Sequence, residues 1–436
     1  MVAAHMPLLP SLKIFRHQGY RHYWIARQLI SAERQMVAVA IGWQIYDLAR
    51  LTRSVEESAF LLGLVGLAQF LPVLLLSLVG GQAADRIDRK MILVVSNIIR
   101  LLIIGGLFAA SLAPAAAAIP AIFTAAVLMG CVNAFTPAAS NALYPTLIPR
   151  GELPLAIAWN SLGYQAAAII GPALGGFLYI GGPQLVYGVA GAIAAIAILI
   201  FWTAQTPAHQ PDKNARGLAM VIAGLRYVRD NKVVLGAISL DLVVVFFGGV
   251  TALLPVFARD VLHVGAEGLG LLRAAPALGA AMIAFAVAVK PLERRVGAWL
   301  LGSIAVYGAA MIGFAFSQFL WLSMALLAIT GAADMISVFI RMSLVQLATP
   351  DGMRGRVSAV SFIFISASNE LGEFESGVAA RFLGPVGAVL LGGAVSIIAA
   401  ASWFRLFPAM ARADRFEEVE QSLAQPKPGG TNASIQ

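Results

Sequence analysis

The stretch GGQAADRIDRK, residues 80–90, separates two long apolar runs that cover residues 58–82 and 91–112. Its two leading glycines can end a helix and let another backbone approach closely, because glycine has no side chain. Asp85 can face the positive N-terminal end of a neighbouring helix. The basic residues that follow are of the kind that holds a loop on one side of a membrane. The stretch therefore predicts a short loop between two membrane helices, with a role beyond simple connection.

Apolar runs of the same kind continue on both sides of this loop. A bilayer core about 30 Å thick needs about 20 apolar residues in a helix. Delimited by Pro, Gly and charged residues, the predicted membrane helices cover residues 22–48, 58–82, 91–112, 118–144, 154–180, 184–203, 233–257, 266–289, 297–317, 319–347, 356–382 and 385–405. The predicted fold class is an all-α integral membrane protein with twelve transmembrane helices in two six-helix halves.

The composition excludes an ordinary soluble protein. Of the 436 residues, 59% are hydrophobic and 12% charged, and soluble domains carry about twice that share of charge. Cys131 is the single cysteine, and with five histidines it offers no cluster for zinc or an iron–sulfur centre. The net charge of +8 does not indicate a nucleic-acid partner, because the Lys and Arg residues lie between apolar runs instead of on one folded basic face. The sequence predicts no metal and no cofactor.

Lys and Arg are distributed unequally between alternate loops. Most lie in the two tails and in the loops that would share their side, whereas the other side holds only Arg50, Arg53, Arg259 and, at a helix end, Arg381. Both termini are therefore expected in the cytoplasm. Residues 217–231 are typical of an amphipathic helix at the membrane surface, with an extension of the seventh span as the alternative. The expected divisions are an N-terminal segment over 1–21, a half over 22–203, a central loop over 204–232, a second half over 233–405 and a tail over 406–436.

The two halves share a pattern at an offset of 201 residues. Gly130 in the fourth span falls opposite Gly331 in the tenth, and Gly171 in the fifth falls opposite Gly372 in the eleventh. One ungapped offset that covers a helix, its loop and the next helix favours a true repeat over chance matches. Two six-helix halves repeated in parallel are typical of one large class of transporters, whose substrate site lies near the bilayer midplane between the halves.

Two motifs carry a resemblance to a known family. Residues 80–90 resemble the cytoplasmic loop motif of the major facilitator superfamily, G-x-L-A-D-R-x-G-R-[RK], with Ala83 where Leu is usual and Asp88 where Gly is usual. Residues 171–176, GPALGG, resemble the G-P-x-x-G-G antiporter motif of that superfamily. With the topology and the repeat, the match is most similar to the drug-antiporter-like branch that includes enterobactin-type siderophore exporters.

The resemblance implies two moving parts. The loop would gate the cytoplasmic end and hold the halves together when the protein opens outward, through Gly81, Asp85, Arg86, Arg89 and Lys90. The fifth helix would act as a hinge and seal: Pro172 is expected to kink it, and the glycines to permit close packing, at Gly171, Pro172, Gly175 and Gly176. A purely topogenic basic loop and ordinary helix packing without gating are the alternatives.

Charged residues inside spans are the candidates for the transport site, because a charge at the bilayer centre costs about 2.5–3.5 kcal/mol. The resemblance implies that helices one, four, seven and ten line the central cavity. The candidates for substrate or proton binding on these helices are Glu33, Arg34, Asp241, Asp334 and Arg341. Related drug–proton antiporters carry an arginine in the fourth helix, which this chain lacks, so Arg34 or Arg341 would take that place.

The eleventh span contains three carboxylates within NELGEFE, residues 369–375. Glu370 and Glu373 share a helix face, so their mutual repulsion and their burial favour a proton on one of them, as proton coupling requires. Glu375 points away from this face and is expected to form a structural ion pair with Arg273. The sequence leaves open whether Glu33, Asp334 or the Glu370/Glu373 pair carries the proton.

The leading interpretation is a secondary active transporter that works by alternating access and exports an amphipathic organic compound, drug-like or siderophore-like, in exchange for protons. A proton-coupled uptake symporter of the same fold and a non-transporting membrane sensor are the alternatives. An enzyme is not expected, because no loop carries a nucleophile–base arrangement or a P-loop. The expected partners are a small-molecule substrate, protons and the lipid bilayer, and the protein is expected to be a monomer in a bacterial inner membrane.

Overall fold

The computed structural model describes residues 11–207, 217–292, 294–411 and 414–416. This part of the chain is helical and contains no strand. The elements are η1 (Leu12–Arg16), α1 (Gln18–Ala49), α2 (Val55–Arg86), α3 (Arg89–Ser111), α4 (Ala115–Leu143), η2 (Tyr144–Leu147), η3 (Arg150–Glu152), α5 (Leu153–Tyr179), α6 (Pro183–Thr203), α7 (Gly217–Asp230), α8 (Lys232–Phe247), α9 (Val250–Val256), the π-helical turn η4 (Phe257–Val261), α10 (Ala266–Val289), α11 (Val296–Phe316), α12 (Leu320–Leu347), α13 (Asp351–Leu406) and α14 (Pro408–Ala411).

The predicted twelve-helix fold is confirmed. Ten stretches of the described chain are long and apolar enough to cross a membrane. α1, whose middle holds Glu33 and Arg34, is not among the ten, and α13 counts once although it contains two spans. Gly384 divides α13, because its φ of 73° interrupts the helix. Parts of the predicted N-terminal segment, central loop and tail lie outside the described residues.

The seventh predicted span, 233–257, differs from the expectation. The structure divides it into α8, which ends at Phe247, and α9, which begins at Val250. Gly248 and Gly249 lie between them, and the chain then continues through η4. The apolar composition of this run predicts one continuous span. A glycine pair permits a break in a helix, but composition alone does not show whether the break occurs.

The loop of residues 80–90 also begins the next helix. Asp88, which stands where the superfamily motif has glycine, is the N-cap of α3: its side chain accepts a hydrogen bond from the Met91 backbone N–H at 3.1 Å. N-capping satisfies one of the backbone donors that every helix start leaves without a partner. The departure from the motif therefore has a local structural role.

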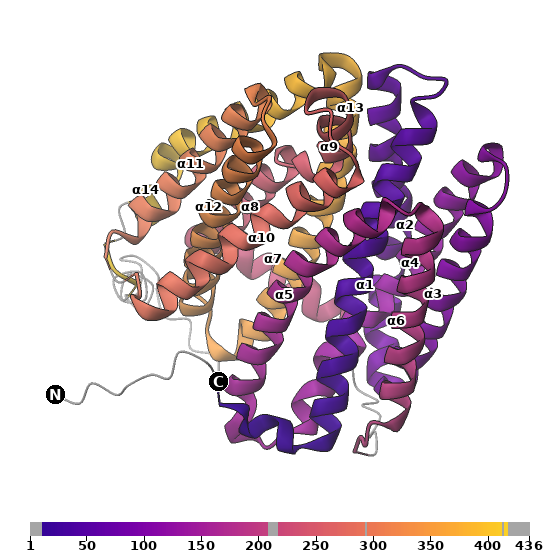
Figure 1. The fold of residues 1–436 in the computed structure, drawn as a ribbon. Coiled ribbons are helices and arrows are strands. Elements are labelled where there is room, and N and C mark those ends of the chain that lie inside the picture. Colours follow the sequence, from indigo (N-terminus) through magenta and orange to yellow (C-terminus); the bar gives the residue numbers. More distant parts are fainter. Residues whose placement is uncertain (1–10, 208–216, 293, 412–413, 417–436) are drawn as a thin grey trace, which may run out of the picture.

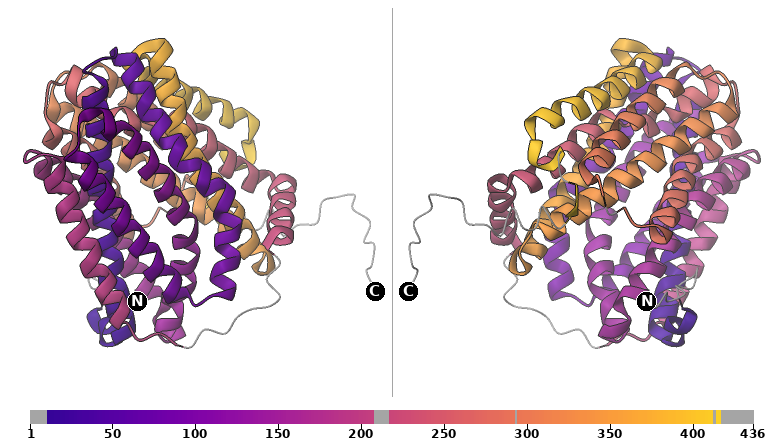
Figure 2. Two further views of the ribbon diagram at one scale, coloured as in Figure 1. Left: turned by 90° about the vertical axis from the view of Figure 1, so that its right-hand side faces the viewer. Right: turned by 90° about the vertical axis from the view of Figure 1, so that its left-hand side faces the viewer.

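The repeat seen in the sequence is present in the packing. A Cβ added at Gly130 of α4 would lie 2.2 Å from the Gln69 carbonyl of α2, and one added at Gly331 of α12 would lie 1.9 Å from the Pro276 carbonyl of α10. Each glycine thus allows the fourth helix of its half to touch the backbone of the second. Figure 1 shows the resulting bundles, α1–α6 in indigo to magenta and α8–α13 in pink to yellow, and Figure 2 shows the same arrangement from both sides.

Buried apolar side chains of the described chain form three clusters, and only one contains residues from both halves. That cluster includes Ile45 of α1, Leu253 of α9 and Phe314 of α11, at the end of the bundle opposite η1. A second cluster belongs to the first half and a third to the second half. The apolar core therefore joins the halves at the end opposite η1, here called the closed end, and is divided at the η1 end.

The predicted amphipathic helix is α7, which lies at the η1 end. It packs on α13 and also contacts α2 of the first half. Gly224 and Val228 face inward, whereas Ile222, Leu225 and Arg226 are exposed. Tyr227 fixes the helix by donating its hydroxyl hydrogen bond to the Ala348 carbonyl at the end of α12. α7 is thus a separate element and not an extension of the seventh span.

Candidate functional site

The first half holds a sealed ion pair. Glu33 of α1 accepts a hydrogen bond at Oε2 from Nε of Arg100 of α3, at 2.7 Å. The Glu33 side chain is 0% exposed and the Arg100 side chain 6%. The other carboxylate oxygen, Oε1, is buried and accepts no hydrogen bond from the described residues. Removing one member of such a pair would leave a buried charge without a partner, which is strongly destabilising. The geometry is therefore that of a pair that stabilises the fold.

Arg34, the next residue of α1, has a different environment. Its side chain is exposed although it lies in the middle of a membrane-spanning helix. It interacts electrostatically with Tyr164 of α5 and with Glu370 of α13, which belongs to the other half. No acidic side chain of the described chain lies within ion-pair distance of it, so Arg34 presents a positive charge toward the space between the halves.

The second half holds a charged cluster of three residues. Arg341 of α12 forms an ion pair through Nη1 with Asp241 of α8, and its Nη2 lies 3.8 Å from the Asp334 carboxylate. Its Nε donates a hydrogen bond to the Ser337 carbonyl at 3.3 Å. The side chains of Arg341 and Asp241 are 9% and 13% exposed, whereas that of Asp334 is 49% exposed. One cation is therefore shared by two carboxylates, of which Asp241 is held tightly and Asp334 loosely.

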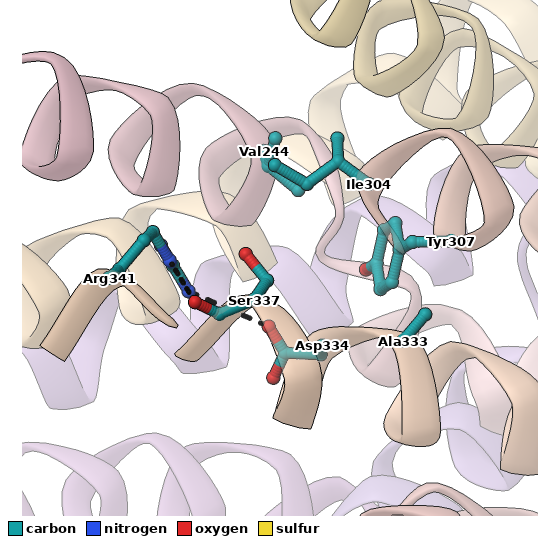
Figure 3. Close-up of a pocket in the computed structure, with 7 residues that line it drawn as sticks. All are labelled: Val244, Ile304, Tyr307, Ala333, Asp334, Ser337 and Arg341. Carbon is teal, nitrogen blue, oxygen red and sulfur yellow. Dashed lines mark hydrogen bonds and ion pairs between the residues drawn. The ribbon is translucent and has the colours of Figure 1, made fainter. Parts of the chain in front are cut away.

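This cluster borders a small cavity between α8, α11 and α12. Figure 3 shows Tyr307, Ser337, Asp334 and Arg341 around it. Apolar residues complete the lining, namely Val244, Ile304 and Ala333. Three of the predicted site residues, Asp241, Asp334 and Arg341, thus meet at one place. Among the described residues no group of His, Cys, Asp and Glu side chains could hold a metal ion.

The carboxylates of α13 lie at the contact between the halves. The Glu373 carboxylate packs on α2, where a Cβ added at Gly66 would lie 3.2 Å from its Oε2. Glu370 interacts electrostatically with Glu373 and with Arg34. Glu370 and Glu373 thus act on each other as like charges, and the proton expected on one of them stays a prediction.

Arg273 of α10 does not form the expected ion pair with Glu375. No ion pair joins these two described residues, and Glu373 is the carboxylate that acts on Arg273 electrostatically. The Arg273 side chain instead extends toward α1, where its Nη1 would lie 3.9 Å from a Cβ at Gly42. Equal depth in the membrane suggested the pair, but depth does not fix the direction in which a side chain leaves its helix.

Two basic residues of the loop motif, Arg89 and Lys90, make hydrogen bonds within the first half. Arg89 donates from Nη1 to the Ala142 carbonyl at 2.9 Å, and Lys90 donates from Nζ to the Trp202 and Ala204 carbonyls at 2.8 and 2.7 Å. Arg86 is exposed and Asp85 is partly buried. The expected role of these residues in joining the halves stays a prediction.

Close backbone approach in this motif occurs at Gly80 and not at Gly81. A Cβ added at Gly80 would lie 2.2 Å from the Ala134 carbonyl of α4, whereas one added at Gly81 would meet nothing within 4 Å. The sequence could not separate the two, because successive helical residues point about 100° apart and the register against α4 is a tertiary property.

The glycines of α5 produce the expected close packing. Gly171 and Gly175 face α1, where added Cβ atoms would lie 2.7 Å from the Ala32 carbonyl and 2.9 Å from the Met36 backbone. Gly176 faces α10 of the other half, and the Pro172 carbonyl also faces α10, at Gly270. α5 is continuous from Leu153 to Tyr179 across Pro172. The motif thus lets one helix touch its own half and the opposite half.

Two crossed ion pairs join the halves at the closed end. Arg259 of η4 pairs with Asp47 of α1, with Nη1 and Oδ1 2.5 Å apart, and Arg50 pairs with Asp260 of η4 at 3.3 Å. Tyr46 adds a hydrogen bond from its hydroxyl to Asp260. The Asp260 hydrogen bond raises the pKa of the Arg50 guanidinium above its usual value. Each half therefore supplies one acid and one base.

A further contact between the halves lies near these pairs. The Arg381 guanidinium of α13 lies 4.9 Å from the centre of the Phe60 ring of α2, a cation–π contact.

Sequence reasoning assigned Arg50, Arg259 and Arg381 to one side of the membrane but gave them no role. It also missed Arg100 as the partner of Glu33. The available signal was a charged residue inside an apolar span, which needs a partner.

Known proteins share sequence similarity with most of this chain. The transmembrane secretion effector family, MFS_3, matches residues 10–427. The enterobactin exporter EntS of Citrobacter koseri is 28% identical over 385 residues, which cover 86% of each chain. The enterobactin exporter EntS of Escherichia coli O6:K15:H31 is also 28% identical, over 377 residues that again cover 86% of each chain.

Solved structures with low sequence identity share the fold. A bacterial homologue of the human lysosomal transporter Spinster, inward-facing and unoccupied, superposes with a TM-score of 0.71 at 17% identity and covers 92% of this chain and 100% of its own. A D-xylose–proton symporter gives a TM-score of 0.68 at 13% identity, with 91% and 99% covered. The chain therefore belongs to the transmembrane secretion effector family of the major facilitator superfamily, and it is an integral membrane transporter and not an enzyme.

Proposed function

We propose that the protein exports an amphipathic, siderophore-like organic compound across a bacterial inner membrane in exchange for protons. The protein works as a monomer by alternating access, in which its two halves, residues 22–203 and 233–405, move against each other. Both termini lie in the cytoplasm. The Asp241–Arg341–Asp334 cluster carries this proposal. It places three charges inside membrane-spanning helices, beside a cavity, with one of them open to exchange. Intramembrane charges of this kind mark substrate and proton pathways.

Asp334 is the group in this cluster best suited to carry a proton. Arg341 can neutralise one carboxylate, and Asp241 lies closer to it. Asp334 lies 3.8 Å from Arg341 with about half of its side chain exposed, so it can exchange a proton or a ligand with the cavity. Glu33 is fully buried and already paired with Arg100, which favours a structural role. The Glu370/Glu373 pair, at the contact between the halves, is the second candidate.

The relatives and Arg34 support the substrate class. The two relatives described above are named enterobactin exporters. Arg34 offers a positive charge in the middle of the membrane to an acidic group, and the exposed Tyr164 lies near it. The opposite half supplies the carboxylates of Asp334 and Glu370. Charges of both signs on facing halves suit an amphipathic organic compound better than a simple ion.

The conformation is the one in which an exporter loads its substrate. With the termini in the cytoplasm, the closed end faces the periplasm, and the divided core faces the cytoplasm. A compound would enter between the halves from the cytoplasmic side. Export then requires the crossed ion pairs of the closed end to break and the loop of residues 80–90 to join the halves at the other end.

Transport in proteoliposomes with an imposed pH gradient tests the proposal. Enterobactin is added first and a lipophilic cation second, and internal pH is recorded together with substrate movement. Wild type is expected to couple enterobactin movement to opposite proton movement, and Asp334→Asn to lose about tenfold or more of the coupled rate. Asp230→Asn, which changes an exposed aspartate at the end of α7, is the matched control and is expected to leave the rate unchanged.

Three results would contradict the proposal. Substrate and protons moving in the same direction would establish the uptake symporter. Enterobactin movement without any proton movement would remove proton coupling. Equal rates for Asp334→Asn and Asp230→Asn would exclude Asp334 as the carrier, and the same assay on Glu370→Gln/Glu373→Gln then tests the second candidate.

A further inference from the structure

Tyr307 of α11 contacts both the charged cluster and the break in the seventh span. Its ring lines the cavity with Asp334 and Arg341, as Figure 3 shows. Its hydroxyl donates a hydrogen bond to the Gly248 carbonyl at 3.1 Å, between α8 and α9. The ring also packs against two of the three hydrophobic clusters, the one shared by the halves and the one of the second half.

The break at Gly248 separates two parts of the seventh span with different contacts. α8 carries Asp241 of the charged cluster, whereas the chain beyond the break carries Arg259 and Asp260 of the closed end. α9 also contacts α1 and α2 of the first half. A shift at the break would therefore move the residues that hold the halves together without moving the cluster itself.

The break is closely packed, so small displacements there have consequences. A Cβ added at Gly248 would lie 2.5 Å from the Tyr307 hydroxyl, and one added at Gly249 would lie 2.3 Å from the Gly372 carbonyl of α13. Packed elements of this kind move between discrete arrangements instead of deforming continuously.

We propose that Tyr307 is a positioning residue that couples the Asp241–Arg341–Asp334 cluster to the closed end. A phenol has one proton to donate, and in this conformation the Gly248 carbonyl receives it. Asp334, on the same cavity, is a competing acceptor that acts on Tyr307 electrostatically. Transfer of this hydrogen bond from Gly248 toward Asp334 releases the break, and the α9–η4 segment can then leave the first half. This inference rests on the proposed transport function.

A double-mutant cycle on the conformational equilibrium tests the coupling. Cys131 is replaced by Ser, and spin labels are attached to cysteines at Leu51 and Phe319, exposed residues in the loops that follow α1 and α11. The ratio of open to closed distances is measured by pulsed electron resonance for wild type, Tyr307→Phe, Asp334→Asn and the double variant. The labels report the closed end directly and do not require substrate.

The expected result is non-additivity. Asp334→Asn is expected to change the ratio about five- to tenfold in the wild-type background, and less than about twofold once Tyr307 is Phe. Tyr227→Phe is the matched control, because its hydroxyl also donates to a backbone carbonyl of the second half, but at the η1 end. In that background the effect of Asp334→Asn should keep its full size.

Equal effects of Asp334→Asn with Tyr and with Phe at position 307 would overturn the inference. Should Tyr307→Phe not fold, Gly248→Ala displaces the same hydroxyl from the other side and should give the same loss of coupling. The proposed function fails separately, when wild type moves no compound in proteoliposomes. Additive effects of the two substitutions on the open-to-closed ratio, in a protein that still transports, would refute only the role of Tyr307 and leave the proposed function standing.

Discussion

The two halves of the molecule share their packing and differ in how they hold charge. Gly130 and Gly331 occupy equivalent places and permit the same close contact between the second and fourth helices of each half. In the first half, Glu33 and Arg100 form a pair that is closed to solvent. In the second half, Arg341 is shared between Asp241 and the half-exposed Asp334. The repeat thus supplies one scaffold twice, and we propose that the charge pair of the first half stabilises the fold whereas the charged cluster of the second half forms the transport site.

The contrast between the halves predicts the largest effect when the carboxylate of the sealed pair is removed. Glu33→Ala leaves the Arg100 guanidinium buried without its partner, which costs about 3–5 kcal/mol. The expected result is a large loss of thermal stability in detergent, measured by the temperature at which the folded protein no longer elutes from a size-exclusion column.

The control for this prediction replaces both partners. Glu33→Leu/Arg100→Met removes the charges together, and such replacement is often neutral or stabilising. We expect it to recover most of the lost stability. Full stability of the single Glu33→Ala variant would show that the pair is not structural, and the contrast between the halves would fail.

The shared scaffold is tested at the repeated glycines. Gly130→Ala and Gly331→Ala each force a Cβ against a backbone carbonyl, at 2.2 and 1.9 Å, and overpacking of this kind costs about 1–3 kcal/mol. Similar losses of stability are expected in both halves. Gly105→Ala and Gly302→Ala, one control in each half, meet nothing within 4 Å and should leave the melting temperature unchanged. A loss at only one of the two repeated positions would contradict the symmetric packing.

A smaller effect is expected at the closed end. Arg259→Asp places two carboxylates against each other where the halves meet, and at partly exposed positions such a change is worth about 0.5–1 kcal/mol. A cysteine at the buried Ile45, in a chain without Cys131, should then be labelled two- to fivefold faster, on the order set by that energy.

Exchange of the charges provides the control at this end. Asp47→Arg/Arg259→Asp restores an ion pair with the partners reversed and should slow the labelling again. Unchanged labelling in the single variant would show that the apolar cluster alone holds the halves together.

Much of the fold followed from the sequence because the bilayer imposes it. Helix lengths, the helix count and the repeat are local or periodic properties, and the span predicted over 266–289 coincides with α10. The break at Gly248 and Gly249 was not predicted, because glycine pairs also occur in continuous membrane helices. Close approach at Gly80 instead of Gly81 likewise depends on how α2 turns toward α4.

The candidate site was predicted in part. Asp241, Asp334 and Arg341 were chosen as charges inside spans, and they meet in the structure. Whether they form one cluster depends on how α8 is rotated about its axis relative to α12, and the sequence does not specify this rotation. The same limit explains why Arg100 was missed and why Arg273 was matched with Glu375 instead of Glu373.

The proposed location of the transport site in the second half is tested most directly by comparing coupled transport per folded molecule between the two charge sites. Movement of enterobactin and of protons is measured in proteoliposomes for Glu33→Leu/Arg100→Met and for Asp334→Asn, each normalised to folded protein. The first variant is expected to transport at close to the wild-type rate, whereas the second should lose about tenfold or more. Loss of coupling in the first variant with normal coupling in the second would contradict this location, because the site would then lie in the first half.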